Sequence, residues 1–245
     1  ILEGKYSISG VHDDVIFEEV LDAHPSFRVL TESGLPDIRV IVFNMVPVMA
    51  MIRIPTPESD GKANMELGAI ALGIDMGRGK TTGGCKKTTF ITKMPNGEST
   101  EGFQIPFWDE ILYSCSKIQQ STGIGFLGVD LTITKTGVKV LEINARPGLK
   151  IQVANKIPLR ARLEKVTDLK VLTPEEGVEV AKTLFSRSSA NETETLDKPV
   201  IGPQEFVTLN LESPINVMAS IDLLAESNVI KSKYISGERK VVDIT

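Results

Sequence analysis

Two apolar segments that each contain one acidic residue constrain this chain more than any other feature of its sequence. Residues 126–134 (FLGVDLTIT) and 138–143 (VKVLEI) have the β-branched, apolar composition of strands, and the turn at 135–137 lies between them. Asp130 and Glu142 lie inside these segments. If the two strands pair, their carboxylates lie close together on one face of an antiparallel sheet.

Asn144 adds a third oxygen donor to the same face, because it follows Glu142 by two positions and alternate residues of a strand share a face. Carboxylate and amide oxygens suit Mg²⁺, which completes its octahedral shell with water and nucleotide phosphate. The alternative is that Asp130 and Glu142 are polar residues on the solvent-facing side of a hairpin. We favour the metal site, because both acids have apolar sequence neighbours and two adjacent carboxylates repel unless a cation lies between them.

The rest of the chain predicts an α+β fold. Residues 37–54 indicate a hairpin that turns at 44–47, and 67–75 indicate another strand. The Gly- and Lys-rich segment 77–87 is expected to be a turn. Apolar spacing and stop signals predict helices at 107–122, 151–155 and 174–185.

Composition excludes several classes of function. The formal net charge of −5 argues against a nucleic-acid or anionic-membrane binder, and no run approaches the roughly 20 apolar residues of a membrane span. With 2 cysteines and 2 histidines, a disulfide framework, a zinc site and a Ser-His-Asp triad are poorly supported. A metal must then be held by oxygen ligands. Without a signal-peptide pattern at its first residues, the chain is expected to be cytoplasmic.

The segments GVD and LEINARPGL at 128–149 resemble the metal-binding signature of the ATP-grasp carboxylate–amine ligases. The resemblance is strongest to the alpha-L-glutamate ligases related to the ribosomal-protein S6 modification enzyme. Further segments match that family in the same order, and together they cover residues 1 to about 165: EEV at 18–20, GLPDIRVIV at 34–42, VPVMAMIR ending at Arg53, and SDGKANMELGAIALGID at 59–75.

The resemblance implies the C-terminal nucleotide- and metal-binding subdomain of an ATP-grasp fold, with an antiparallel sheet, flanking helices and a small β-rich tail. ATP and Mg²⁺ are the implied cofactors, with Mn²⁺ as an alternative metal. The resemblance implies that Asp130, Glu142 and Asn144 bind magnesium, that Glu19 and Val20 contact adenine, and that Asp37 lies near the ribose. It implies that the loop residues Lys62, Ala63 and Asn64 close over the phosphates. It also implies that Arg39, Arg53 and Arg146 bind phosphate or the substrate carboxylate. For each arginine, an ordinary surface or interstrand ion pair is the open alternative.

The chain departs from the family pattern in its phosphate loop and at its beginning. Met65 and Glu66 follow Asn64, where the family has an Asn-Leu-His run, and Lys62 replaces an arginine of the S6-modifying enzymes. The family's two nucleotide-binding lysines and glycine-rich loop precede the segment that matches residue 1. We therefore expect this chain to be part of a longer protein.

The expected reaction joins a carboxylate, with glutamate as the leading candidate, to an amine through an acyl phosphate. The expected partners are an amino acid or a peptide or protein acceptor, without nucleic acid or membrane; a homo-oligomer is left open. Two alternatives remain. One is a non-catalytic nucleotide-binding or scaffold module, and the other is a β-rich interaction fragment without a ligand.

Three regions divide the chain: an ATP-grasp-like domain at 1–165, a helix and linker at 166–198, and a β-rich tail at 199–245. The tail faintly resembles the first strands of retropepsin-like aspartic proteases. Asp222 is followed by Leu223 and Leu224, however, where those proteases have threonine and glycine. A β extension that packs on the ligase domain is the favoured alternative for the tail.

Overall fold

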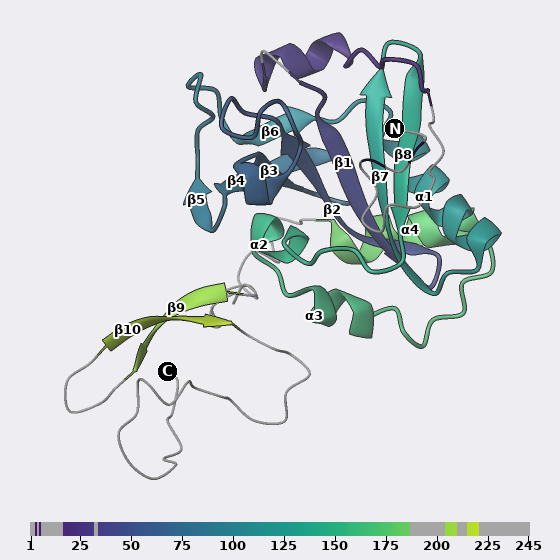
Figure 1. Ribbon diagram of the computed structural model, residues 1–245. Coiled ribbons are helices and arrows are strands. Elements are labelled where there is room, and N and C mark those ends of the chain that lie inside the picture. Colours follow the sequence, from purple (N-terminus) through teal and green to yellow (C-terminus); the bar gives the residue numbers. More distant parts are fainter. Residues whose placement is uncertain are drawn as a thin grey trace.

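The computed structural model describes residues 17–31, 34–186, 204–209 and 215–220, together with Glu3 and Lys5. Most of the described strands form one antiparallel sheet in the order β5-β4-β3-β2-β1-β7-β8, with β6 paired to β4 (Figure 1). The strands are β1 (Asp37–Phe43), β2 (Val46–Ile54), β3 (Ile70–Ile74), β4 (Lys80–Lys86), β5 (Thr89–Ile91), β6 (Glu101–Gln104), β7 (Phe126–Thr134) and β8 (Gly137–Asn144). The predicted α+β class with an antiparallel sheet is confirmed.

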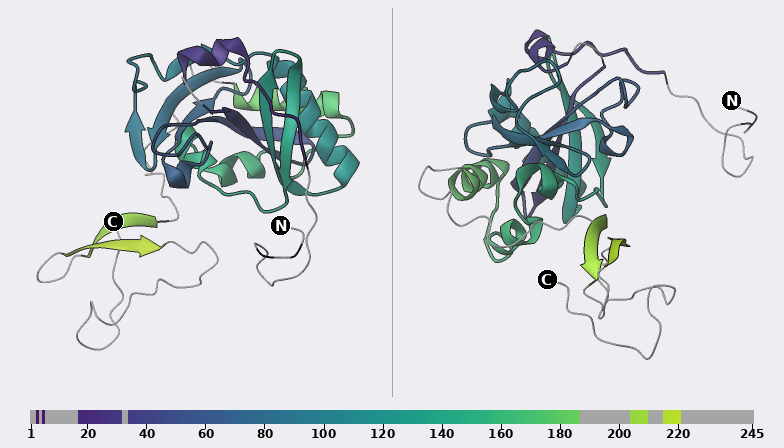
Figure 2. Two further views of the ribbon diagram at one scale, coloured as in Figure 1. Left: turned by 45° about the horizontal axis from the view of Figure 1, so that its top comes forward. Right: turned by 90° about the vertical axis from the view of Figure 1, so that its left-hand side faces the viewer.

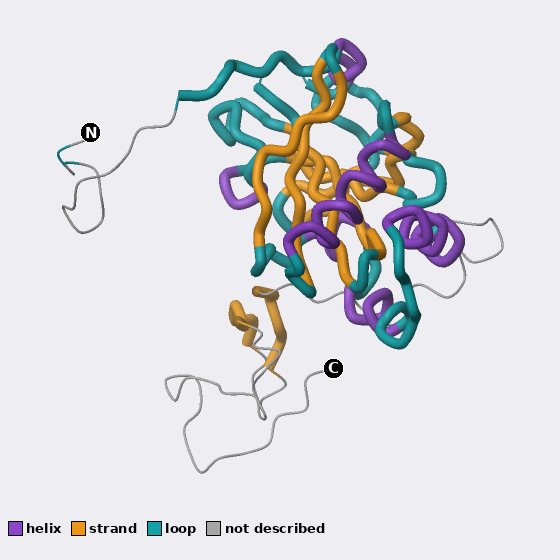
Figure 3. Tube along the Cα trace, turned by 90° about the vertical axis from the view of Figure 1, so that its right-hand side faces the viewer, coloured by secondary structure: helices purple, strands orange, loops and turns teal. Residues whose placement is uncertain are grey.

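Helices lie on both faces of the sheet. α1 (Trp108–Thr122) and α4 (Pro174–Phe185) pack against each other and contact β2, and α1 also contacts β1 and β7 (Figure 3). α2 (Ile151–Asn155) contacts β2, β3 and β4, and the shorter α3 (Leu159–Glu164) contacts β2. A Cβ at Gly73 would lie 2.7 Å from the carbonyl oxygen of Ala154, so α2 lies directly on the sheet. None of the helices in the described part of the chain is long and apolar enough to cross a membrane.

The β1–β2 hairpin turns on fewer residues than expected. Phe43 already pairs with Val46, and Asn44 and Met45 between them both have positive φ angles, 54° and 59°. Two central residues with positive φ match the twist of the flanking strands. Pro47 therefore belongs to β2, beside an irregularity in the register, where its missing N–H is tolerated.

The segment expected to be a turn at 77–87 is mostly strand. The residues up to Gly79 and Lys87 lie in turns, whereas the residues between them form β4, which pairs with β3, β5 and β6. Its glycines serve close packing: a Cβ at Gly84 would lie 2.4 Å from Leu72 Cδ2. A glycine inside a strand often marks such a close approach, and the prediction of a turn over the whole of 77–87 is therefore wrong.

The close approach of α4 to the β1–β2 turn leads to a stability prediction. A Cβ at Gly177 would lie 2.0 Å from the carbonyl oxygen of Met45, which also accepts a 2.6 Å hydrogen bond from Ser116 Oγ. Alanine is favoured over glycine inside helices by about 1 kcal/mol, but here it forces α4 away from the turn. We expect Gly177→Ala to destabilise the chain by about 1–3 kcal/mol in urea unfolding. Glu179→Ala, on the exposed side of the same helix, is the control; a more stable Gly177→Ala chain contradicts the described packing.

Two further strands, β9 (Gln204–Leu209) and β10 (Ile215–Ser220), form a separate antiparallel pair. The backbone register places Val207 opposite Val217. Asp222, on which the comparison with aspartic proteases depends, lies outside the described residues. That hypothesis and the proposed domain boundaries therefore stay predictions.

Candidate functional site

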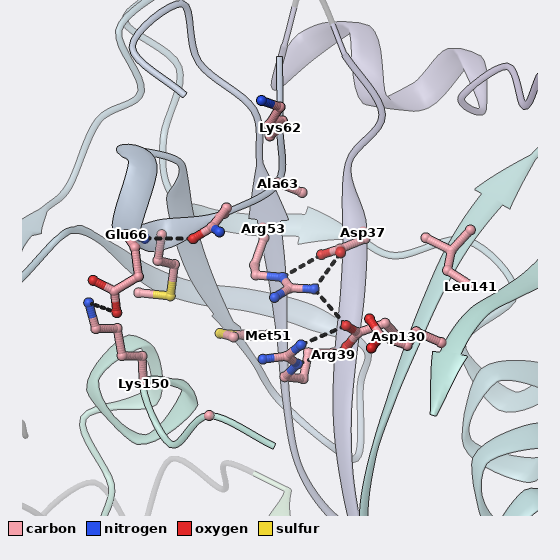
Figure 4. A pocket seen from close by; sticks show the side chains of 14 residues that line it. Asp37, Arg39, Met51, Arg53, Lys62, Ala63, Glu66, Asp130, Leu141 and Lys150 are labelled. Atoms are coloured by element: carbon pink, nitrogen blue, oxygen red, sulfur yellow. Dashed lines mark hydrogen bonds and ion pairs between the residues drawn. The ribbon is translucent and has the colours of Figure 1, made fainter. Parts of the chain in front are cut away.

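A cavity of about 520 Å³ lies on the sheet face that carries the predicted metal ligands (Figure 4). Strands β1, β2, β7 and β8 form its floor, and two loop segments, 62–66 and 148–150, form its walls. The residues that line it are Asp37, Arg39, Met51, Arg53, Lys62, Ala63, Asn64, Met65, Glu66, Asp130, Leu141, Glu142, Gly148 and Lys150.

Strand register brings the charged residues of the floor together. Asp37 pairs with Arg53, Arg39 with Asp130, and Asp130 with Glu142. Directly opposed residues of an antiparallel pair share a face, and so do alternate residues of one strand. These side chains therefore lie on one face in two adjacent rows, Asp37 with Arg53 and Arg39 with Asp130 and Glu142. The predicted proximity of Asp130 and Glu142 is confirmed, although the β7–β8 register shifts immediately beyond Asp130.

The buried acids of the floor are held by the arginines. Arg39 donates from Nε and Nη2 to the two carboxylate oxygens of Asp130, at 2.7 Å and 2.6 Å. Arg53 donates to both oxygens of Asp37 and, from Nη2, to Asp130 Oδ2 at 2.9 Å. Two cations and two anions thus form one buried network, which we call the floor quartet (Asp37, Arg39, Arg53 and Asp130). The interstrand ion pairs left open for the arginines are present for Arg39 and Arg53.

Ionisation of the quartet is tuned by burial. Burial raises the pKa of the Asp37 carboxyl from its ordinary value of 3.8 to about 6, although Arg53 acts against the rise; the charge of Asp130 adds to it. For Arg53, burial acts to lower the pKa, but the hydrogen bonds and charges of Asp37 and Asp130 outweigh it and the pKa is raised. With a pKa of about 6, Asp37 changes charge in mildly acidic solution.

This raised pKa predicts a pH dependence of stability. Between pH 3.8 and about 6 the folded chain keeps a proton on Asp37 that the unfolded chain has lost. The stabilisation linked to that proton is complete below pH 3.8 and disappears as the pH rises through about 6. We expect the unfolding free energy of the unaltered chain to fall relative to that of Asp37→Asn over this range, in urea titrations from pH 4 to 7. A difference between the two chains that is independent of pH would contradict the raised pKa.

Glu142 differs from the acids of the quartet. It is exposed, it lines the cavity opposite Asp130, and no side-chain hydrogen bond or ion pair of Glu142 is found in the described part of the chain. Asp130 is buried, and its oxygens already accept three hydrogen bonds. A carboxylate offers about four acceptor positions, so Asp130 retains room for one further partner.

This donor set fits Mg²⁺. The described residues contain no group of three or more His, Cys, Asp or Glu side chains placed to hold a metal ion. Magnesium does not require such a cage, because one or two carboxylates with water and nucleotide phosphates satisfy it. Glu142 would supply free carboxylate oxygens and Asp130 one further oxygen. These are hard ligands of the kind that the metal prefers.

The remaining predicted residues divide between the cavity and its surroundings. Lys62, Ala63 and Asn64 line it from the loop, and Asn64 caps the short helix η2 (Met65–Leu67) by accepting a 2.8 Å hydrogen bond from the Glu66 backbone N–H. Four predicted residues do not line it: Asn144, Arg146, Glu19 and Val20. Their roles stay predictions.

These four residues lie at different places outside the cavity. Asn144 pairs with Gly128, on the same sheet face as Glu142, but a Cβ at Gly128 would meet Pro147 at 2.6 Å, so the chain after β8 folds over this part of the face. Arg146 is exposed. Residues 17–24, which include Glu19 and Val20, cross the end of the β7–β8 hairpin (Figure 2), where Ala23 pairs with Thr134.

Sequence reasoning missed several residues that line the cavity: Met51, Met65, Glu66, Leu141, Gly148 and Lys150. Met51 precedes Arg53 by two positions in β2, so strand alternation could have placed it on the same face. Lys150 carries no such signal. It reaches the cavity because the segment after β8 returns over the sheet, where a Cβ at Gly148 would lie 3.8 Å from Arg39 Nη1.

The antiparallel sheet with helices on both faces and a cavity on one face agrees with the ATP-grasp fold, which the match to a family model identifies. The chain belongs to the sugar-transfer associated ATP-grasp family, which matches residues 1–168. No curated protein matches the chain.

A similar solved structure is the ATP-grasp ligase PsnB complexed with minimal precursor, at 15% sequence identity. The match covers 62% of this chain and 35% of that chain, with a TM-score of 0.25. This chain thus spans about a third of that ligase's length.

Proposed function

We propose that this chain provides the magnesium- and nucleotide-binding part of an ATP-dependent ligase that joins a carboxylate to an amine. One observation carries the proposal: Glu142, an acid without a side-chain partner among the described residues, faces the cavity opposite Asp130. Such an arrangement favours a bound cation. Membership of an ATP-grasp family supports ATP as the nucleotide that accompanies it.

The chain's own residues divide the work. Glu142 and Asp130 would hold Mg²⁺, with Asn144 as a further oxygen donor, and the ion would neutralise charge on the nucleotide phosphates. Lys62 lies in the wall above the floor, where its ammonium can meet a phosphate oxygen. Because the floor quartet pairs Arg39 and Arg53 with acids, it holds both guanidinium groups in fixed positions beside the ligand.

The proposed chemistry requires no side-chain nucleophile. A substrate carboxylate oxygen attacks the γ-phosphorus of ATP, and ADP leaves. The amine then attacks the acyl phosphate, forms the amide bond, releases inorganic phosphate and loses a proton to solvent. Glutamate is the leading candidate for the carboxylate. The family's description connects it with sugar transfer, so an amino sugar joins the amino acids and peptides as a candidate amine.

A non-catalytic nucleotide-binding module is the second candidate. The observation that favours it is the floor quartet, in which the paired nitrogens of Arg39 and Arg53 are already engaged by carboxylates. An incoming phosphate would have to compete with those acids or use the remaining guanidinium nitrogens. Such a cavity can hold a nucleotide without accelerating its reaction.

Trapping with hydroxylamine separates these candidates. The chain is incubated with ATP, Mg²⁺, L-glutamate and hydroxylamine, which converts any acyl phosphate to a hydroxamate, and both ADP and hydroxamate are measured. The ligase is supported if ADP and hydroxamate both form only when L-glutamate is present, and if neither forms with Glu142→Ala. Nucleotide binding without carboxylate-dependent ADP supports the binding module instead.

A further inference from the structure

A second charged pair lies at the wall of the cavity, outside the floor quartet. Lys150 Nζ lies 2.5 Å from Glu66 Oε1, and both residues line the cavity (Figure 4). Lys150 immediately precedes α2, whereas Glu66 belongs to η2 in the opposite wall segment. The Lys150 side chain is 24% exposed and that of Glu66 is 70% exposed. The lysine stem is thus largely covered while its ammonium reaches the cavity.

The cations of the cavity differ in how readily they can accept a new anion. Arg39 and Arg53 are held by buried carboxylates, and separating such pairs leaves uncompensated buried charge. The Lys62 side chain is 64% exposed, and its Nζ lies as far as 3.7 Å from Asp60 Oδ2, so this ion pair holds the ammonium weakly in place. Lys150 combines a covered stem with a solvent-exposed partner, and exposed ion pairs contribute little stability. Lys150 can therefore exchange Glu66 for another anion at small cost.

We propose that Lys150 is a ligand-binding residue. Its ammonium gives up the ion pair with Glu66 and binds an anionic oxygen of the ligand in the cavity. The ammonium offers three N–H donors to a carboxylate of the substrate or to a phosphate of the nucleotide. Glu66 is its positioning residue and holds the ammonium at the wall while the cavity contains no ligand. This inference rests on the proposed function, because it assigns to the same cavity a contact that the magnesium ligands do not provide.

A purely structural role of the pair makes a different prediction, because the pair also joins two wall segments. If Glu66 competes with the ligand for Lys150, Glu66→Gln frees the ammonium and tightens anion binding. If the pair only braces the walls, both Glu66→Gln and Lys150→Met loosen the cavity and weaken binding. The direction of the change in Glu66→Gln therefore distinguishes the two roles.

The chain contains a matched control pair. Lys182 of α4 lies 2.8 Å from Asp109 of α1, with side-chain exposures of 27% and 78% that resemble those of Lys150 and Glu66. Neither residue lines the cavity. Lys182→Met thus removes the same kind of ion pair, with a similar expected change in melting temperature, and leaves the cavity intact.

The test is calorimetric titration of the unaltered chain, Lys150→Met, Lys150→Arg, Glu66→Gln and Lys182→Met. The first probe is the non-hydrolysable nucleotide AMP-PNP with Mg²⁺, and the second is L-glutamate at saturating Mg²⁺ and AMP-PNP. Loss of a charge-assisted hydrogen bond is expected to weaken binding about 10- to 100-fold in Lys150→Met. Lys150→Arg, which keeps the charge, should restore part of that loss, and Lys182→Met should bind as the unaltered chain does.

The probe that Lys150→Met binds more weakly identifies the group that Lys150 contacts. Weaker binding of AMP-PNP indicates a phosphate contact, and weaker binding of L-glutamate alone indicates contact with a substrate carboxylate. Equal affinities of Lys150→Met and the unaltered chain for both probes would overturn the inference and leave the proposed function standing. Weaker binding in Glu66→Gln would also overturn it, in favour of a bracing role. An unaltered chain that binds neither probe would contradict the proposed function itself.

Discussion

Glu142→Ala is expected to weaken magnesium-dependent nucleotide binding by at least about 100-fold, equivalent to about 2.7 kcal/mol, and to leave the fold intact. Glu142 is exposed, lies on the edge strand β8 and has no side-chain partner among the described residues, so truncation removes no internal contact. The unfolding free energy should stay within about 0.5 kcal/mol of the unaltered chain. Calorimetric titration with AMP-PNP and Mg²⁺, together with urea unfolding, measures both quantities.

Glu101→Ala is the matched control for this change. Glu101 is also an exposed acid on a strand, but it lies in β6, outside the cavity. Its replacement should alter neither binding nor stability. Nucleotide affinity that survives in Glu142→Ala would show that the metal assignment is wrong.

Asp130→Ala is expected to reduce the unfolding free energy by about 3–5 kcal/mol, in addition to impairing nucleotide binding. Asp130 is 4% exposed and accepts hydrogen bonds from both Arg39 and Arg53. Its removal leaves a net positive charge in the buried network, and Asp37 alone remains to balance two guanidinium groups. Urea unfolding at pH 7 measures the loss of stability.

The contrast with an exposed acid makes this prediction specific. Asp109→Ala breaks the pair with Lys182 in which the Asp109 side chain is 78% exposed, so it should change the unfolding free energy by no more than about 1 kcal/mol. If Asp130→Ala is no more destabilising than Asp109→Ala, the floor quartet does not stabilise the fold. The two proposed magnesium ligands should therefore differ in their effects: replacing Glu142 weakens nucleotide binding alone, whereas replacing Asp130 weakens both binding and stability.

Local sequence patterns predicted the centre of the site because its geometry is local. A short turn joins β7 to β8, so two apolar runs with one acid each were enough to place Asp130 opposite Glu142. The structure brings Asp37, Arg39 and Arg53 onto one face by the same alternation through the β1–β2 hairpin, although only the family resemblance had singled these residues out. The register of a hairpin depends on residues only a few positions apart, so the pattern of a single sequence is enough to predict it.

The rest of the site depends on contacts between segments distant in sequence. Lys150 meets Glu66 across the cavity only because the chain after β8 returns over the sheet, and no local period signals that return. Pairing of Arg39 with Asp130 joins strands that are 91 residues apart. The glycines of β4 resembled a turn because their packing partner, Leu72 of β3, is visible only in the folded sheet.

The most direct test of the account is calorimetric titration of this chain with AMP-PNP in the presence and absence of Mg²⁺. We expect saturable binding at one site with Mg²⁺, and binding at least about 10-fold weaker, a difference of about 1.4 kcal/mol, without it. That result would place a metal-dependent nucleotide site within these residues. Absence of binding under both conditions, or equal affinity with and without Mg²⁺, would contradict the assignment of Asp130 and Glu142 as the magnesium ligands.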